Sequence, residues 1–303
     1  MNQYKKFLGR TDLVKNQVER EKLAEQEASD KRKRSIQQQN KQRWLKYQEQ
    51  LRSELAARYF HAVQSTGGDS VFNKYSLALD GTDDYAVGSS TYSELDGQNN
   101  FAFSFWIKPS AISGYRQILT IGTAAADYRN QQVQIAISSG KIQVYVSSTS
   151  YYWRSTTILT QDVWQHILVT RKSSRPVGQK GKVYINGDDA SFADNTRYWT
   201  NNTPSNSPLM IGRHNNGWAS LFPGKIDEVA VYTQDMADYI SEIYGGGEAV
   251  DLNALATAPS PLSYYRMGDN DGGTGTTVTD QGTSNYNLSL VSDASFEEDV
   301  PGS

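Results

Sequence analysis

The sequence predicts a mainly β protein: an antiparallel β-sandwich of the jelly-roll kind, preceded by an extended α-helical N-terminal segment. Two observations predict this division. Of the 24 glycines, 23 lie beyond residue 60, as do all eight prolines. Beyond residue 75, short runs rich in β-branched and aromatic residues recur between turn signals, which is typical of antiparallel sandwiches. We expect a helical segment 1–62, a linker 63–75 with its softest point at Gly67-Gly68, and a sandwich 76–303.

The helical segment is predicted from composition. Residues 11–60 contain no Gly or Pro and are dominated by Lys, Arg, Glu, Gln, Ala and Leu, which favour helix. Thr11 or Asp12 is suited to cap its start, and Ser29-Asp30 to separate two helices. The apolar pattern thins in the middle, so it lacks the three or four heptads that a coiled coil requires. Because so polar a helix is seldom stable alone, we expect it to dock on a partner.

The docking segment is strongly basic. Residues 1–60 hold 15 Lys/Arg and 8 Asp/Glu, whereas residues 61–303 hold 15 and 25. Such asymmetry suggests that the two parts meet different partners. We expect the helix to lie along an acidic protein surface within an assembly, as part of a homo-oligomer, and the expected contacts are Lys31, Arg32, Lys33, Arg34, Trp44, Leu51 and Leu55. A nucleic-acid arm is the weaker alternative, because acids accompany these cations and no recognition fold is present.

Several classes of protein are excluded or disfavoured by composition. There is no cysteine, so disulfides and thiolate chemistry are excluded. The three histidines, His61, His166 and His214, are scattered, which disfavours a zinc site. No apolar run approaches the 18 residues of a membrane span, and the N-terminus lacks the apolar stretch of a secretory signal. We expect a soluble protein made without export.

The sandwich strands can be placed from the pattern. Two pairs of strands are expected to form hairpins, with turns at Ser139-Gly140 and at Asn186-Gly187, since such dipeptides suit tight primed turns. One short amphipathic helix, within residues 233–247, ends in three glycines. The expected strands are residues 75–79, 101–108, 117–122, 132–138, 141–147, 164–172, 182–186, 209–212 and 225–232.

Alternation within strands predicts which side chains face the core. In FAFSFWIK, Phe101, Phe103 and Phe105 share one face and should point inward, with Trp106 on the opposite side. In KIDEVAVY, Asp227 and Glu228 fall on opposite faces. One of these two acids must therefore lie near an edge or be paired.

Taken in order, these pieces resemble a known family. The segments SLALDGTDDYAVG, FAFSFWIKPS, WQHILVTRK, GKVYINGD and LMIGRHNNGWASLFPGKIDEVAVY are similar to the laminin G-like branch of the concanavalin A-like lectin/glucanase superfamily, over about residues 76–247. The resemblance implies a concanavalin A-like jelly roll.

The C-terminal part, residues 262–301, looks like a strand pair found on one edge of such domains. Its form YYRMGD…DQG…DVP is similar to virion proteins of marine bacteriophages that carry this lectin-like fold. The resemblance implies a virion location, as capsid decoration or as a tail-fibre or adaptor component, after synthesis in the host cytoplasm. Other virion proteins would then be the partners of the helix.

Relatives that are glycosidases carry a Glu-x-Asp-x-Glu strand, which places three acids on one face. The nearest stretch here is Glu94-Leu95-Asp96-Gly97-Gln98, where the third acid is replaced and the residues suggest a turn. We therefore predict a non-enzymatic protein, with a glycoside hydrolase as the weaker alternative.

Exposed aromatic residues are the expected glycan contacts, because sugars stack on aromatic faces flanked by amides and hydroxyls. The preferred candidates are in expected loops: Tyr152, Trp153, Tyr198, Trp199 and Trp218. The alternative is that these aromatics pack the rim of the sandwich or a subunit contact. A free carbohydrate-binding lectin, oligomerised by its helices, is the alternative to the virion protein.

Many relatives bind Ca²⁺ at the sandwich rim, and hard oxygen ligands suit that ion. The matching acids are Asp80 and Asp83, with Asp84 beside them. No spacing resembles a dedicated calcium loop, so hydrogen bonds from the carboxylates to the turn backbone are the favoured interpretation.

Overall fold

The computed structural model divides the chain into two compact units, Met1–Gly68 and Asp69–Ser303. In the first unit it describes residues 17, 19–26, 28–34, 38, 39, 41–43 and 46. In the second it describes residues 73–302, apart from 123–132, 147–151, 177, 192–206 and 215–219. The expected softest point of the linker, Gly67-Gly68, lies outside the described residues.

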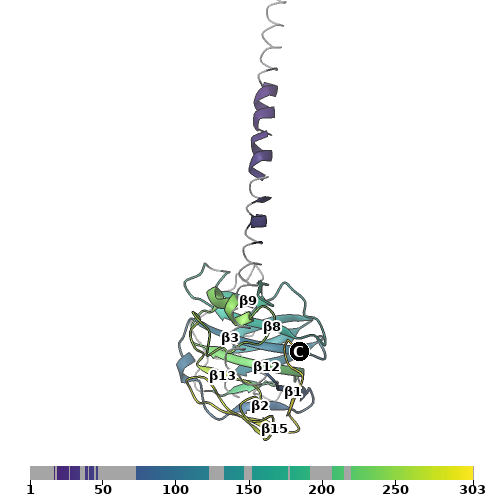
Figure 1. Cartoon of the computed structure of the whole chain (residues 1–303), viewed down its shortest axis with the longest axis vertical. Helices are drawn as coiled ribbons and strands as arrows, with labels where there is room; N and C mark the ends of the chain where they lie inside the picture. The colour runs from purple at the N-terminus through teal and green to yellow at the C-terminus, as the bar shows by residue number, and fades with distance from the viewer. Residues whose placement is uncertain are drawn as a thin grey trace, which may run out of the picture. The chain divides into compact units, whose positions relative to one another are not determined.

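The second unit is an antiparallel sandwich, as predicted. One of its two sheets, sheet A, has the order β10-β9-β8-β3-β12-β1-β16, with β13 also paired to β12. Figure 1 shows β9, β8, β3, β12 and β1 side by side. The strands of sheet A are β1 (Ser76–Asp80), β3 (Phe101–Pro109), β8 (Gln165–Arg171), β9 (Gly181–Ile185), β10 (Asp188–Asp189), β12 (Pro223–Tyr232), β13 (Ser263–Tyr265) and β16 (Ser295–Glu297).

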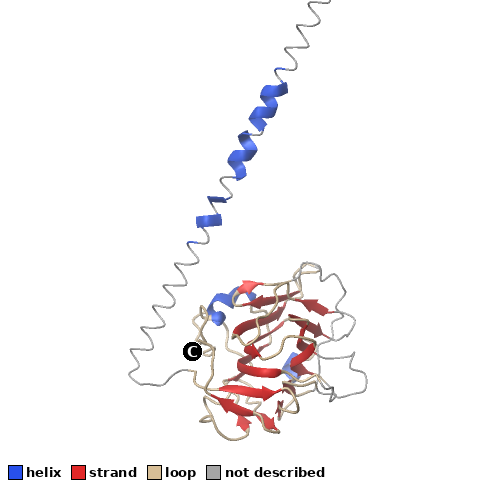
Figure 2. Cartoon of the chain, turned by 90° about the vertical axis from the view of Figure 1, so that its right-hand side faces the viewer, coloured by secondary structure: helices blue, strands red, loops and turns tan. Residues whose placement is uncertain are grey.

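The other sheet, sheet B, has the order β14-β15-β2-β11-β4-β5-β6-β7. Figure 2 shows that the sandwich is built almost wholly of strands and loops. The strands of sheet B are β2 (Tyr85–Gly88), β4 (Tyr115–Ile121), β5 (Val133–Ser138), β6 (Lys141–Val146), β7 (Tyr152–Arg154), β11 (Leu209–Ile211), β14 (Thr277–Val278) and β15 (Leu288–Val291).

Both predicted hairpins are confirmed. Ser139 and Gly140 join β5 to β6 with φ of 51° and 76°, and Asn186 and Gly187 join β9 to β10 with φ of 52° and 82°. Two successive positive φ angles define the primed turn whose twist matches the flanking strands. Every expected strand is present, with ends within two residues of those expected.

The main core lies between the two sheets. Phe101, Phe103 and Phe105 all belong to it and are at most 1% exposed, which confirms the predicted inward face of β3. Full burial of one such side chain contributes about 1.5–3 kcal/mol to folding. From sheet B, aliphatic residues such as Ile135 and Val144 belong to the same core.

A second apolar cluster covers the outer face of sheet A. It contains Leu168 and Tyr264 from the strands and Ile243 from the helix α2 (Ile240–Tyr244), which follows the short 3-10 helix η2 (Ala237–Tyr239). Trp106 faces this side, as predicted, with its ring stacked on Tyr244 at a centroid distance of 5.9 Å. The helix ends at Gly245, which has a left-handed φ of 63°.

A β-bulge resolves the conflict between the two acids of β12. The register with β3 shifts between Asp227 and Ala230, and Glu228 has a positive φ of 50°. The extra residue changes the phase of the alternation, so Ile226 and Val229 both enter the main core. Neither acid lies at an edge: both are at most 2% exposed, and both are paired.

The C-terminal residues complete the same sandwich, but the expected strand pair on one edge accounts for only part of them: β14 and β15 pair at the edge of sheet B. Residues 262–301 supply four short strands that are divided between the sheets. In sheet A, β13 pairs with β12 and β16 pairs with β1, whereas in sheet B β15 pairs with β2 and β14 pairs with β15. Strands of two to four residues are too short to show a period in the sequence.

The described residues of the first unit are helical, including 19–26 and 28–34. Ser29 and Asp30 lie within the second stretch, so they do not separate two helices as expected. Asp30 instead forms an ion pair with Lys33 at 3.8 Å. Among the described residues, no helix is long and apolar enough to cross a membrane.

Candidate functional site

The outer face of sheet B at strands β6 and β7 carries polar and aromatic side chains. Because Ile142, Val144 and Trp153 enter the core, the alternate residues of these strands point outward. We define the β6–β7 face by these outward residues: Lys141, Gln143, Tyr145, Tyr152 and Arg154. Such a set combines aromatic surface with hydrogen-bonding groups.

Two tyrosines form the centre of the β6–β7 face. Tyr145 and Tyr152 are directly opposite in the strand register, with ring centroids 5.3 Å apart and planes tilted by 57°. Tyr152 is 44% exposed, so its ring is open to a ligand. The amide of Gln143 donates to the hydroxyl of Tyr145. Burial raises the pKa of Tyr145, so its hydroxyl is neutral at pH 7.

Trp153, which the sequence suggested as an exposed stacking platform, is not exposed. Its indole is only 1% exposed and belongs to the main core. A Cβ added to Gly181 of β9 would lie 2.6 Å from this ring. The expectation for Trp153 was wrong because the strand β7 places Tyr152 outward and Trp153 inward.

The other aromatic candidates, Tyr198, Trp199 and Trp218, lie outside the described residues, as do Trp44, Leu51 and Leu55 of the helical segment. The connection that contains Tyr198 and Trp199 begins after Ser191, which bridges Ser155 directly after β7.

Sequence reasoning missed Tyr145, Gln143 and Arg154 as members of this face. A signal for the first two was present in KIQVYV, where Lys, Gln and Tyr alternate with Ile and Val. The corresponding signal for Arg154 was weaker, because β7 has only three residues.

Among the described residues, the central part of the outer face of sheet A offers no comparable surface. His166 is fully buried against Trp106 and Tyr244, and its Nε2 is 2.8 Å from the hydroxyl of Ser104. Burial lowers the pKa of His166 to about 3, so it is neutral at pH 7. Although a Ser–His pair suggests nucleophilic chemistry, a substrate has no access to it.

The acids of the loop between β1 and β2 form a compact group. Ligand oxygens of Asp80, Asp83 and Asp84 lie within 4.8 Å of one another, which would suit a calcium ion. However, Asp80 Oδ1 already accepts hydrogen bonds from the amides of Thr82 and Asp83, at 2.7 and 3.4 Å. These are the turn hydrogen bonds that the sequence favoured for Asp80.

The stretch Glu94-Leu95-Asp96-Gly97-Gln98 does not form a catalytic strand. Residues 93–95 form the 3-10 helix η1 (Ser93–Leu95), and Gly97 has a positive φ of 67°. Glu94 accepts a hydrogen bond from the hydroxyl of Tyr286 at 2.7 Å. The acids therefore do not line one strand face, as the glycosidase signature requires.

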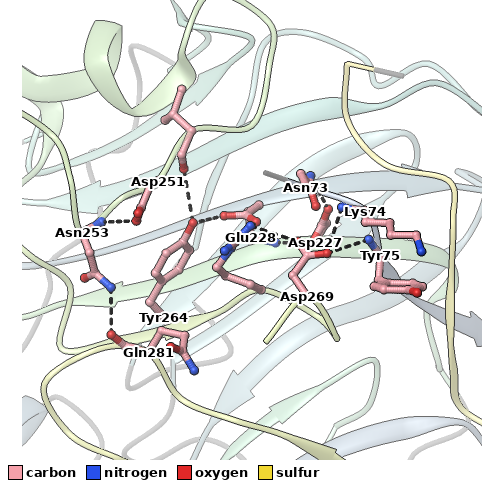
Figure 3. A network of polar contacts seen from close by, with 12 residues as sticks. Asn73, Lys74, Tyr75, Asp227, Glu228, Asp251, Asn253, Tyr264, Asp269 and Gln281 are labelled. Carbon is pink, nitrogen blue, oxygen red and sulfur yellow. Dashed lines mark hydrogen bonds and ion pairs between the residues drawn. The ribbon is translucent and has the colours of Figure 1, made fainter. Parts of the chain in front are cut away.

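A third acidic group is buried at the bulge of β12 (Figure 3). There the strands β1 and β13 pair with opposite ends of β12, and the chain that enters β1 meets the chain that leaves β13. Asn73 donates to Asp227 at 2.9 Å, and the amides of Lys74 and Tyr75 donate to Asp269 at 2.8 and 2.9 Å. Residues 73–75, expected in the linker, are thus bound to the sandwich.

Electrostatics at the bulge keep a proton on the buried acids. Burial and the neighbouring Glu228 raise the pKa of Asp227 well above its usual range. Burial also raises the pKa of Glu228 to about 8, although Arg266, at 3.4 Å, and the hydroxyl of Tyr264 oppose this shift. Because both acids are closed to solvent, they cannot attack a bound sugar.

Comparison with known structures agrees with the fold. A candidate carbohydrate-binding protein from Bacteroides ovatus superimposes with a TM-score of 0.50 at 17% identity, covering 75% of this chain and 61% of that one. This chain therefore spans less than two thirds of that protein. A heptameric SAP-like pentraxin from Limulus polyphemus gives a TM-score of 0.44 at 14% identity, covering 57% and 82%.

Domains LG4-5 of the mouse laminin alpha1 chain give a TM-score of 0.40 at 12% identity, covering 52% of this chain and 41% of that one. No curated protein sequence matches the chain significantly. The family model of laminin G type that is described as the concanavalin A-like lectin/glucanases superfamily matches residues 79–238, which is more than half of the chain. The chain therefore belongs to the concanavalin A-like lectin/glucanases superfamily.

Proposed function

We propose that the sandwich is a non-enzymatic glycan-binding domain whose binding site is the β6–β7 face. The observation that carries this proposal is the pair Tyr145–Tyr152, a tilted aromatic surface with one ring 44% exposed. Gln143 and Arg154 lie opposite each other on the neighbouring pair. Gln143 is buried and its amide holds the hydroxyl of Tyr145, whereas Arg154 brings a guanidinium to this face. Aromatic surface beside a few polar groups is the usual composition of a sugar site.

Two further observations support this proposal. The Bacteroides ovatus protein with a similar fold is described as a candidate carbohydrate-binding protein. The central outer face of sheet A is closed by its second apolar cluster, whereas Tyr152 leaves the face of sheet B open. A non-enzymatic role is supported by the two acidic groups just described, since the acids near Glu94 lie in a turn and those of the bulge are buried.

A glycan array probed with the full-length chain tests the site. We expect Tyr152→Ala to weaken binding about tenfold, because one aromatic contact is worth roughly 1 kcal/mol or slightly more. Ile158→Ala is the matched control, since Ile158 is also exposed, at 60%, but lies outside the β6–β7 face. Equal loss in both variants, or none with Tyr152→Ala, would contradict the site.

For the whole chain we propose a structural role in a bacteriophage virion, where the helical segment docks on the particle and the sandwich is displayed. Support comes from the resemblance of residues 262–301 to phage virion proteins and from the charge difference between the two parts. Lys31, Arg32, Lys33 and Arg34 are all exposed on a helix, so they are available to an acidic partner surface.

The alternative is a free lectin that oligomerises through its helices. Sedimentation and circular dichroism of residues 1–68 distinguish the two, because a docking segment should be largely unfolded alone and an oligomerising one helical and associated. A fully helical monomer would contradict the docking proposal. Cryo-electron microscopy of purified particles would then place the chain on the capsid or tail.

A further inference from the structure

The two sheets differ in how their charges are balanced. The strands of sheet B, as described, contain Arg116, Lys141 and Arg154 but no Asp or Glu. This is unexpected in a domain that is acidic as a whole, since residues 61–303 hold 25 acids and 15 Lys or Arg. The excess of acids must therefore lie in sheet A and in the connections.

Cations of sheet A and its connections are mostly neutralised by carboxylates. Lys225 contacts both Glu297 and Asp299 at 2.7 Å, and Arg175 contacts both oxygens of Asp235 at 2.7 Å. Similar ion pairs hold Lys74, Lys108, Lys172, Lys182 and Arg266. Within the described part of the chain, by contrast, none of the three strand cations of sheet B forms an ion pair with a carboxylate.

Two of these cations belong to the β6–β7 face. Lys141 and Arg154 share the outward side with the tyrosine pair, whereas Arg116 lies opposite Ile137 on the core side of β4. Arg154 donates from Nη2 to the carbonyl of Ser138 at 2.9 Å, and Lys141 is directly opposite Ser138. The two positive charges are therefore gathered at one side of Tyr145 and Tyr152.

We infer that the glycan bound by the β6–β7 face is anionic and carries carboxylate or sulfate groups; this inference rests on the proposed glycan-binding function. The carbonyl of Ser138 accepts from Nη2 of Arg154 and fixes the guanidinium. The Nε of Arg154 is buried, so Nη1 and the second N–H of Nη2 are the donors left for an oxyanion. Lys141 adds a second positive charge. The tyrosine pair holds the sugar ring, and the two cations select for charge.

Electrostatics favour an anion at this place despite the acidic domain. Fields from surface charges fade over about 8 Å at physiological salt, so nearby cations outweigh distant acids. Since no carboxylate among the described residues is paired with Lys141 or Arg154, an incoming anion displaces none of those acids. A neutral glycan would gain nothing from the two charges.

Binding of the full-length chain to matched polysaccharides tests the inference. Polygalacturonate and its fully methyl-esterified form differ only in the ester, which adds a methyl group and removes the charge of each carboxyl group. λ-Carrageenan and its desulfated form isolate the sulfate. We expect at least tenfold tighter binding to the charged member of one pair, with affinity that falls as salt rises, and the pair that responds identifies the anion.

Substitutions at Lys141 and Arg154 test whether these two cations cause the preference for charged polymers. We expect the double variant Lys141→Gln/Arg154→Gln to bind the charged polymer at least tenfold more weakly than the wild type does. Its binding of the neutral partner polymer should be unchanged. Lys180→Gln is the matched control, because Lys180 is also without an ion pair among the described residues but lies in the β8–β9 connection. If the double variant folds poorly, Lys141→Gln alone should still weaken binding of the charged polymer and leave binding of its neutral partner unchanged.

The basic helix is the main competing explanation, so a fourth variant replaces Lys31, Arg32, Lys33 and Arg34 with Gln. Loss of binding in that variant, but not in the double variant, would overturn the inference. Equal binding of charged and neutral polymers that Tyr152→Ala abolishes would overturn it too, while the proposed glycan site would stand. Absence of binding to every polymer and to a glycan array would overturn both.

Discussion

Trp153 and Gly181 are in contact where the two sheets meet: a Cβ at Gly181 would lie 2.6 Å from the indole of Trp153. Gly181 begins β9 of sheet A, and Trp153 is the middle residue of β7 in sheet B. The absence of a side chain at one residue makes room for the largest side chain at the other. This contact is part of the packing that joins the sheets near the β6–β7 face.

Gly181→Ala should therefore destabilise the domain by overpacking. We expect its free energy of unfolding to fall by about 1–3 kcal/mol, and Trp153→Ala to lower it by about 3–5 kcal/mol. Denaturant unfolding of the full chain measures both. The control is Gly181→Ala combined with Trp153→Phe, where the smaller ring should relieve part of the alanine penalty. A neutral Gly181→Ala would contradict the close contact.

Loss of glycan binding in Trp153→Ala has to be interpreted with the same contact in mind. Because Trp153 is buried, we expect this variant to lose binding in proportion to its loss of folded protein. Tyr152→Ala should lose binding at an unchanged melting temperature. Thermal unfolding measured beside the binding assay separates the two effects.

The buried acids at the bulge should make the sandwich more stable at mildly acidic pH than at pH 8. The folded-state pKa of Glu228, about 8, is above its unfolded value, so stability is greatest below about pH 4.5 for this group and is lost as pH rises through 8. Asp227 acts in the same direction. Between about pH 4.5 and pH 8, each proton that the folded state retains lowers the free energy of unfolding by up to about 1.4 kcal/mol per pH unit.

Denaturant unfolding between pH 5 and pH 9 measures this slope. Asp227→Asn should flatten it, because an amide keeps the shape and needs no proton; Asp162→Asn, on an exposed loop, is the control. The groups that face the pair are Asn73, Lys74, Tyr232, Tyr264, Arg266 and Asp269. If the free energy of unfolding of the wild type, corrected for the control variant, instead rose from pH 5 to pH 9, the protons would not be held by Asp227 and Glu228.

Asp299 should change stability with pH in the opposite direction to Asp227 and Glu228: its contribution is lost when the pH falls. Burial alone would raise its pKa, but hydrogen bonds from Lys108, Lys225 and Trp164 outweigh it and lower the pKa to about 2. A lowered pKa gives stability that is present above about pH 4 and is lost as pH falls through 2.

We expect Asp299→Asn to cost about 1 kcal/mol at pH 7, after discounting for solvent screening, because this carboxylate is partly exposed. The cost should shrink between pH 4 and pH 2. Glu298→Gln is a matched control, since its partner Lys74 is half-exposed and the pair should contribute less. A cost that is independent of pH would show that the hydrogen-bonded charge is not its source.

Calcium should leave the melting temperature unchanged if Asp80 serves the turn. Its Oδ1 already accepts two backbone amides, and the hydrogen bond from Thr82 lowers its pKa. Differential scanning fluorimetry with millimolar CaCl₂ or with EDTA measures this. A ligand at one hundred times its Kd would add about 2.7 kcal/mol, which is easily seen. A rise in melting temperature that Asp83→Asn abolishes would establish a calcium site.

Long, regular strands were predictable from the sequence, and short or irregular ones were not. In β3 three alternate phenylalanines fix the inward face, and in β5 and β6 the Ser139-Gly140 turn fixes the register as well. In β7 three residues allow either phase, and only the space at Gly181 decides that Trp153 points inward. The position of Tyr152 therefore had to come from tertiary packing.

The acids of β12 show a different limit of prediction from the sequence. Alternation indicated that Asp227 and Glu228 conflict, but two solutions were open, an edge position or pairing. The structure uses pairing together with an extra residue, which changes the phase of the strand. Such a bulge depends on what lies beside the strand, here Arg266 and Asn73, and these are far from β12 in the sequence.

The pairing of β1 with β16 has a consequence for synthesis of the protein. The first strand of the sandwich finds one of its neighbours only when the last one has left the ribosome, and sheet B likewise needs β14 and β15. Neither sheet can be completed before the residues of β14, β15 and β16 have been synthesised, so the domain should fold late, and slowly, because its pairings join distant segments. A truncation that removes β16 would leave β1 as an open edge that invites aggregation.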